Sequence, residues 1–285
     1  MLYNIMVEKI NLEKLEKAGL VVEKDRVLSY SRLICPLDCR YCFTEDLNDI
    51  QNNSAVYLSE EQFELLKDLP EEIKTIMLGC DTEFFLNKNE ALAVLRKLSG
   101  LGKDISVITK LSLDDDFVEN LRLISGEMKR GGNLITLSIS IPCFRSSYKW
   151  EPKIPRVEKR INTLKKVTDI GINSMVAIRP LIPNLEKSEI NQIVDMTNPY
   201  VFGYYSGPLY IKNFKNDLFS KEELTELGCT FEEIEPHWMP KGNRFIKIEN
   251  PELMRYLKEQ VGLSGRKFFE GAAQGMEFLR KTKNV

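Results

Sequence analysis

Histidine is nearly absent from this 285-residue sequence, in which His237 is the single example. Because histidine is the commonest metal ligand and the usual acid–base residue near neutral pH, this scarcity excludes most zinc sites and most His-based mechanisms. An excess of positive charge is missing as well, since 40 Lys and Arg residues face 42 Asp and Glu residues, for a net charge of −2. Charge therefore gives no support to nucleic-acid binding, although a local basic groove would still permit it.

Long apolar runs are also missing. No stretch approaches the ~20 residues of a membrane-spanning helix, and the first residues lack the apolar core of a secretory signal. Six cysteines are too few and too scattered for a secreted disulfide scaffold, so reduced thiols or metal ligation are the better interpretations. We therefore expect a cytoplasmic protein that has no membrane partner.

Apolar segments with strand patterns alternate with amphipathic segments that have helical patterns. We expect strands over residues 27–34, 73–78, 105–109, 134–141, 172–178 and 201–205. We expect helices over residues 10–20, 59–70, 90–98, 114–128, 156–167 and 186–196. Six such alternations with short connections predict an α/β fold, a partial (β/α)6 barrel of the TIM type, because right-handed crossovers curl a parallel sheet. A flat doubly wound sheet is the alternative that periodicity leaves open.

Three regions follow from this pattern. Residues 1–26 form an N-terminal helical extension, residues 27–212 form the partial barrel, and residues 213–285 form a C-terminal helical extension packed on the barrel. In the last region we expect helices that begin at Ser220 and that span residues 251–261 and 264–281.

The most informative motif is Cys-x3-Cys-x2-Cys, formed by Cys35, Cys39 and Cys42 just after the first strand of the barrel. Three thiolates within eight residues cannot share one helix face, so we predict a loop around a compact ligand. A structural zinc ion needs a fourth ligand, and the remaining candidates are not in a paired spacing: Cys80, Cys143, Cys229 and His237. A four-iron cluster on three thiolates leaves one iron open to a small molecule, and we favour it over zinc or over purely structural cysteines.

With Tyr41 and Phe43 flanking the last cysteine, this motif resembles the signature of the radical S-adenosylmethionine (SAM) superfamily. The resemblance implies a 4Fe–4S cluster on these three signature cysteines and SAM bound to the open iron. One electron then cleaves SAM to a 5′-deoxyadenosyl radical, which abstracts a hydrogen atom from the substrate. It also implies an electron donor such as flavodoxin or ferredoxin, and a small-molecule, nucleotide or peptide substrate.

Further segments are similar, in order, to spore photoproduct lyase and related photolyase-like members. They are Cys80–Glu83, Val107–Lys110, Leu137–Ile141, Trp150–Pro152 with Val157–Arg160, and Val176–Pro183. The resemblance implies that Thr82, Lys110 and Ser140 contact SAM, since hydroxyls can bind its amino group or ribose and a cation can pair with its carboxylate. The predicted cofactor site is completed by Phe43, Gly79, Glu83 and Ser138. Glu83 either accepts from the SAM ammonium or caps the following helix.

Cys80 is the predicted catalytic residue, because a matching cysteine in spore photoproduct lyase returns hydrogen to the substrate radical. Its alternative role is that of a small buried apolar residue at a strand end. Cys143 is the second candidate donor, and we expect Cys229 to be structural. The residues at the strand ends support a ligand site independently of any family, because ligands of parallel α/β folds bind at that rim.

The sequence also departs from spore photoproduct lyase. Phe43 stands where that family has a tyrosine, and residues after 205 show no match. The substrate, whether a nucleotide, a nucleic-acid lesion or a small molecule, is therefore left open. His237 and Trp238 can stack on a planar substrate or simply pack together. Modification of a peptide and a non-catalytic iron–sulfur or zinc scaffold are the competing functions.

Overall fold

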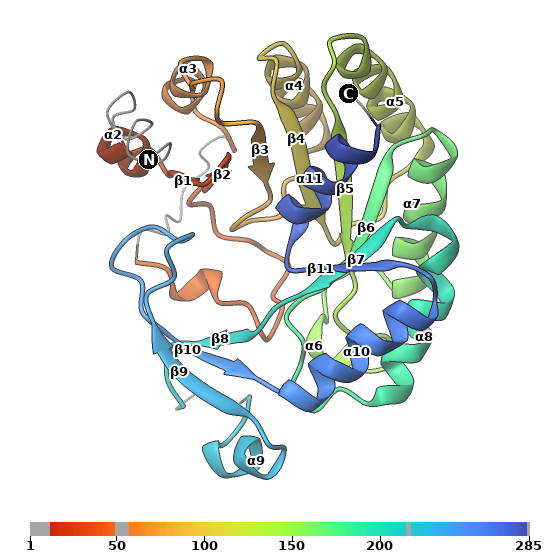
Figure 1. Cartoon of the computed structure of the whole chain (residues 1–285). Coiled ribbons are helices and arrows are strands. Elements are labelled where there is room, and N and C mark those ends of the chain that lie inside the picture. Colours follow the sequence, from red (N-terminus) through yellow and green to blue (C-terminus); the bar gives the residue numbers. More distant parts are fainter. Residues whose placement is uncertain (1–11, 49–56, 215–217, 284–285) are drawn as a thin grey trace.

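One open eight-stranded sheet organises the chain in the computed structural model, which describes residues 12–48, 57–214 and 218–283. Its strands, in spatial order, are β1 (Leu20–Glu23), β2 (Arg26–Ser29), β3 (Thr75–Leu78), β4 (Asp104–Thr109), β5 (Ile135–Ser140), β6 (Asn173–Ile178), β7 (Gly203–Ser206) and β11 (Lys267–Phe269). All neighbouring strands run parallel except β1 and β2. The curved sheet does not close, since β1 and β11 are its two edges (Figure 1). The prediction of a partial α/β barrel is confirmed.

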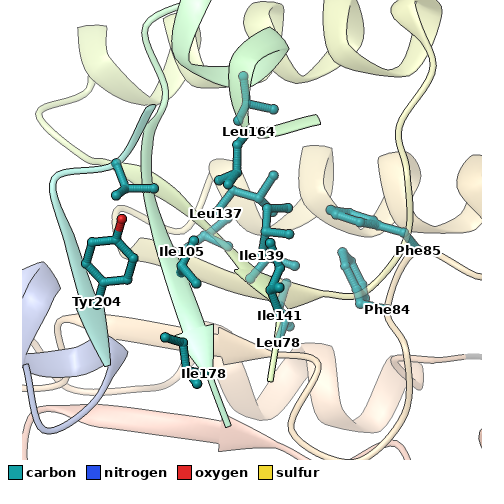
Figure 2. Packing of buried hydrophobic residues seen from close by; sticks show 14 of the residues in the cluster. Leu78, Phe84, Phe85, Ile105, Leu137, Ile139, Ile141, Leu164, Ile178 and Tyr204 are labelled. Atoms are coloured by element: carbon teal, nitrogen blue, oxygen red, sulfur yellow. The ribbon is translucent and has the colours of Figure 1, made fainter. Parts of the chain in front are cut away.

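Helices cover the outer face of this sheet (Figure 1). They are α3 (Glu60–Lys67), α4 (Lys88–Ser99), α5 (Asp115–Arg130), α7 (Val157–Asp169) and α8 (Lys187–Thr197). The short α2 (Leu12–Lys17) precedes β1, and the short α6 (Ser147–Trp150) follows β5 at the end where the strands finish. Side-chain caps start several of them, as where Asp114 accepts from the backbone N–H of Phe117. The apolar core lies between helices and sheet, and Figure 2 shows Ile105, Leu137 and Ile139 of the strands packed there.

The inner face of the sheet is lined by smaller and more polar residues. Along β5, Thr136, Ser138 and Ser140 alternate with the outward-facing Leu137 and Ile139. This leaves room inside the barrel for α11 (Ala272–Lys283), which crosses the concave side of the sheet (Figure 1).

Helix α11 lies at the end of the barrel where the strands begin. Its Met276 is fully buried, with the sulfur 3.0 Å from Thr136 Oγ1. The Arg280 guanidinium donates to Asp104 Oδ2 at 2.6 Å and to Asp25 Oδ2 at 3.1 Å. Because Asp104 is the first residue of β4, these contacts place α11 at the N-terminal ends of the strands, away from the rim where ligands are expected.

The C-terminal region contains strands that the sequence analysis did not predict. A second sheet has the order β8 (Leu209–Ile211), β10 (Phe245–Glu249), β9 (Thr230–Ile234), and it accompanies α9 (Lys221–Glu226) and α10 (Pro251–Leu263). The expected helix over residues 264–281 is wrong in its first part, where β11 pairs with β7. Glycine at 203 permits this pairing, since a Cβ there would lie 2.4 Å from the Phe269 ring.

The N-terminal region also differs in part from the expectation. The helix expected over residues 10–20 is α2, which ends at Lys17, and Leu20 already belongs to β1. Residues 1–11 of the expected extension lie outside the described residues. Within the described residues, no helix is both long enough and apolar enough to cross a bilayer.

Candidate active site

A cavity of about 680 Å³ extends from the C-terminal ends of the barrel strands along the inner face of the sheet to α11 and the start of β2. One side is formed by the cysteine loop (residues 30–43), which follows β2 and contributes Tyr41, Cys42 and Phe43. The strand ends contribute Gly79, Cys80, Lys110, Ser140, Arg179 and Tyr205. Strand β8 adds Tyr210, and the C-terminal region adds Trp238. The cavity therefore joins the signature motif to the rim at which the sequence predicted a cofactor site.

Asp81 fastens the beginning of the cysteine loop to the end of β3. Its carboxylate accepts hydrogen bonds from the backbone N–H of Arg32 at 2.6 Å and from the Ser31 hydroxyl at 3.1 Å. The same side chain accepts from the backbone N–H of Thr82 at 2.8 Å. Farther along the loop, the N–H of Arg40 donates to the carbonyl of Trp150 at 3.0 Å. The loop is thus fixed at both ends by neighbours that are distant in sequence.

The three signature cysteines carry free thiols in this loop. Burial raises the pKa of Cys39 to about 12 and also raises that of Cys42, so binding of a metal would displace protons from these thiols. Among the described residues, no three His, Cys, Asp or Glu side chains gather closely enough to hold one metal ion. A four-iron cluster binds each thiolate through a different iron, whereas a zinc ion needs all its ligands around one point. The donor set therefore fits an iron–sulfur cluster better than zinc.

Lys110 is the centre of a buried polar network beside the cavity. Its Nζ lies 2.8 Å from Tyr41 Oη, 2.6 Å from Ser140 Oγ and 3.0 Å from Glu151 Oε1. The other carboxylate oxygen of Glu151 accepts from Arg160 at 2.6 Å, and Arg160 also donates to the Ser140 carbonyl at 2.7 Å. The side chains of Glu151 and Arg160 have no exposed surface. Lys110, Glu151 and Arg160 form what we call the buried triad.

The buried triad carries more positive than negative charge. Burial disfavours the ion at Glu151, but the charges of Lys110 and Arg160 outweigh it and lower the pKa of this carboxyl. Burial likewise opposes the charge of Lys110, yet Glu151 raises the pKa of the lysine. Lys110 and Glu151 therefore keep their charges at neutral pH, and the guanidinium of Arg160 is a second cation on the same carboxylate. This excess positive charge beside the cavity suits a ligand that carries a carboxylate.

Sequence reasoning missed the roles of Asp81, Glu151 and Arg160. Glu151 and Arg160 belong to the segments Trp150–Pro152 and Val157–Arg160, which were noted only as marks of the photolyase-like branch. The available signal was the position of each charge in the sequence. Glu151 follows Trp150, and Arg160 lies on the apolar face of its helix. Charged residues at such positions are buried only when they are paired.

Glycine at position 79 is required by the backbone. Its φ is +84°, and a Cβ there would lie 2.6 Å from the carbonyl oxygen of Ile108. The end of β3 can therefore approach β4 closely, and the Gly79 N–H donates to Tyr57 Oη at 2.6 Å.

The other predicted cofactor residues lie behind the cavity wall. The Glu83 carboxylate accepts from Thr109 Oγ1 at 2.6 Å and from the Lys110 N–H at 2.8 Å, so it ties the loop after β3 to the end of β4. The Thr82 hydroxyl is buried and has no hydrogen-bond partner among the described residues. Ser138 is fully buried in β5. Of the predicted cofactor residues, the cavity is lined by Phe43, Gly79, Lys110 and Ser140.

The remaining cysteines differ in their access to the cavity. Cys80 lines it, with Sγ 3.6 Å from the carbonyl of Met77, and burial raises the pKa of its thiol to about 12. Cys143 is completely buried and is not among the lining residues. Cys229 precedes β9, where it packs against the main core. Only the position of Cys80, among these three, allows contact with a ligand in the cavity.

His237 and Trp238 do not form an isolated stacked pair. His237 is exposed, with Nε2 3.1 Å from Glu23 Oε1, whereas Trp238 packs edge-on against Phe43, at 5.9 Å between ring centroids. Phe43 makes similar contacts with Tyr210 and Phe245. The cysteine loop is thereby joined to the C-terminal sheet.

Comparison with known proteins agrees with this geometry. A model of the radical SAM superfamily matches residues 33–197. An uncharacterized protein of Methanocaldococcus jannaschii is 25% identical over 186 residues, which cover 62% of this chain and 68% of that protein.

Solved structures of two enzymes share the fold. SuiB of Streptococcus suis bound to S-adenosylmethionine superposes with a TM-score of 0.59 and 15% identity, over 90% of this chain and 52% of SuiB. A cysteine-to-serine variant of spore photoproduct lyase superposes with a TM-score of 0.60 and 11% identity, over 87% of this chain and 80% of the lyase. The chain thus spans about half the length of SuiB.

Proposed function

The chain belongs to the radical SAM superfamily, whose enzymes use a 4Fe–4S cluster and SAM, and we propose that the three signature cysteines hold this cluster. When bound, the cluster supplies the electron that cleaves SAM into methionine and a 5′-deoxyadenosyl radical, which removes a hydrogen atom from the substrate. The protein holds the reactants in position and excludes water from them. The cysteine loop is suited to this role because Asp81 and Trp150 fix its two ends.

The buried triad is the feature of the structure that supports a SAM site most strongly. We assign Lys110 to the carboxylate of SAM, because its ammonium borders the cavity and shares the carboxylate of Glu151 with Arg160. Ser140 holds the ammonium in place and can donate its own proton to the ligand. The Tyr41 hydroxyl connects this group to the cysteine loop.

The other predicted cofactor residues shape or position the SAM site in this proposal. The unpartnered hydroxyl of Thr82 is available to the amino group or ribose of SAM after a small movement of its loop. Phe43 gives the cavity an apolar side next to Cys42, and Gly79 lets the backbone approach the ligand. Glu83 and Ser138 act as positioning residues behind the wall.

We further propose that Cys80 returns a hydrogen atom to the substrate radical. Its thiol is protonated at neutral pH and faces the cavity, as a hydrogen donor must. The transfer forms a C–H bond and leaves a thiyl radical on Sγ. Either an electron from the protein donor and a proton from solvent restore the thiol, or a hydrogen atom from 5′-deoxyadenosine restores it and re-forms the 5′-deoxyadenosyl radical.

A nucleotide, a nucleic-acid lesion or a small molecule is the proposed substrate class. The fold shared with spore photoproduct lyase supports the first two, since that enzyme has been solved with a dinucleoside spore photoproduct. Peptide modification is the second candidate, because SuiB has been solved with a precursor peptide. A flavodoxin or ferredoxin in a reducing cytoplasm is the proposed electron source, since clustered thiols persist in reduced form there.

The assignment of Lys110 is tested by measuring SAM affinity of the anaerobically reconstituted enzyme by calorimetry. Lys110→Ala should weaken SAM binding ~10- to 100-fold, the value of a charge-assisted hydrogen bond, while iron content stays unchanged. Lys88→Ala is the matched control, because Lys88 is an exposed lysine that pairs with Asp114 on the outer surface. Equal SAM affinity of the wild type and Lys110→Ala would refute the assignment.

A further inference from the structure

Arg179 is a cation that lines the cavity beside Trp238. It follows β6 directly, lines the cavity and is partly buried. Within the described part of the chain, no side chain or carbonyl accepts a hydrogen bond from its guanidinium, and no carboxylate pairs with it. Two other cations of the cavity are paired: Lys110 pairs with Glu151, and Arg26 pairs with Glu23. As far as the described residues go, the N–H donors of Arg179 are thus available to a ligand.

The position of this guanidinium is fixed by packing instead of by acceptors. Its Cζ lies 5.1 Å from the ring centroid of Trp238, within the range of a cation–π contact. Gly207 leaves room for it on the other side, since a Cβ at 207 would lie 3.0 Å from Nε of Arg179. A donor group held in place before binding loses little entropy when an anion arrives.

Aromatic rings border the same part of the cavity. Phe43, Tyr210 and Trp238, which we call the aromatic wall, pack edge-on against one another with centroids 5.6 to 6.0 Å apart. All three line the cavity. Aromatic side chains of this kind bury and orient planar unsaturated rings.

Arg179 and Lys110 occupy different parts of the cavity. Lys110 contacts Tyr41, the residue before the signature Cys42, and Ser140 at the end of β5. Arg179 instead lies against Trp238, and its positive charge partly opposes the rise that burial causes in the pKa of Cys80 and Tyr205. One cation therefore lies beside the cysteine loop, and the other lies beside Trp238, which packs against the same apolar cluster as Cys80.

We infer that Arg179 binds the anionic group of the substrate, a phosphate or a carboxylate, while the aromatic wall holds a planar ring of the same molecule near Cys80. This inference rests on the proposed function, which assigns Lys110 to SAM and Cys80 to the substrate radical. It narrows the substrate to anionic planar molecules, such as a nucleotide or an aromatic acid. A neutral nucleoside or an aromatic amide would lack the group that Arg179 recognises.

Calorimetry on the reconstituted enzyme with SAM bound tests this inference with two matched probe pairs. Thymidine 5′-monophosphate is compared with thymidine, and benzoate is compared with benzamide. The first pair tests recognition of a phosphate, and the second pair tests recognition of a carboxylate. At least one anionic probe should bind roughly tenfold more tightly than its neutral partner, because charged hydrogen bonds contribute to its binding alone. Arg179→Gln should remove that difference. Lys24→Gln, which removes an exposed cation at the edge of the same cavity, should preserve it.

SAM affinity of Arg179→Gln separates this inference from the proposed function. It should equal that of the wild type, because Lys110 serves the SAM carboxylate. A loss of SAM binding in Arg179→Gln would place Arg179 in the SAM site and overturn the inference. The inference is also refuted if neither anion binds better than its neutral partner, or if Arg179→Gln leaves the preference intact. A wild-type enzyme that fails to bind SAM would instead contradict the proposed function.

Discussion

At the scale of single residues, Glu151 is the carboxylate that neutralises part of the charge of two buried cations, Lys110 and Arg160. Replacing one member of a buried ion pair leaves a charge without a partner and destabilises a protein strongly, whereas the complete pair adds little stability. The protein therefore keeps a costly arrangement next to its cavity. In our account the excess positive charge of the buried triad is retained because it binds a ligand.

Glu151→Gln should lower the free energy of unfolding by about 3–5 kcal/mol, because Lys110 and Arg160 would then be buried without a counter-charge. Urea titration followed by circular dichroism measures the change. Glu158→Gln is the control, since Glu158 lies on the exposed side of α7 and should change stability by less than about 0.5 kcal/mol. Similar stabilities of the two variants would show that the buried triad is not ionised as described.

The same carboxyl predicts a pH dependence. Because the folded protein lowers the pKa of Glu151 below its ordinary 4.5, its ionised form stabilises the fold above that pH. This contribution is lost as the pH falls through the lowered value. The difference in unfolding free energy between the wild type and Glu151→Gln should be constant from pH 7 to about 5 and shrink below about 4.5. A difference that grows on acidification would have the wrong sign.

Cys80→Ala tests the hydrogen donor. The variant should still cleave SAM, but the product radical should be quenched by other reductants and form adducts. In deuterated buffer the wild-type product should carry deuterium, because a thiol exchanges its hydrogen with solvent. The hypothesis fails if the wild-type product contains no deuterium and the product profile of Cys80→Ala is unaltered. In that case Cys80 would be a packing residue.

At the scale of elements, the strands and helices of the barrel and the capped helix α9 were predictable, whereas β1 and the strands after β7 were not. Strands such as β5 and helices such as α5 carry a full period of apolar residues, which identifies them from local sequence alone. β11 has three residues and depends on its pairing with β7, where Gly203 makes room for Phe269. A strand of that length has no periodicity to detect, so residues 264–271 had the pattern of a helix start.

Helix α11 predicts a stability effect inside the barrel. Met276→Ala should lower the free energy of unfolding by about 2–5 kcal/mol, because it removes a fully buried side chain from contact with Thr136. Lys281→Ala on the exposed side of the same helix should change it by less than about 0.5 kcal/mol. Thermal unfolding of both variants decides whether α11 supports the barrel, and equal melting temperatures would argue against it.

At the scale of the whole molecule, the two ends of the barrel have different roles. α11 lies at the end where the strands begin and lines the inner end of the cavity, whereas the cysteine loop and the C-terminal region border the cavity where the strands finish. Local motifs predicted the signature cysteines, Lys110, Ser140 and Cys80. Other contacts follow only from the fold, because they join residues about 40 to 60 positions apart. Asp81 binds the cysteine loop, Glu151 pairs with Lys110, and Arg179 lies against the ring of Trp238.

The central claim is that the signature cysteines hold a cluster to which SAM binds. Electron paramagnetic resonance of the reduced, anaerobically reconstituted enzyme, recorded with and without SAM, tests it most directly. We predict a four-iron signal that changes shape when SAM is added and that is lost, together with the ~400 nm absorption, in Cys39→Ala. Full iron content and an unchanged signal in Cys39→Ala, or a wild-type signal that does not respond to SAM, would contradict the claim.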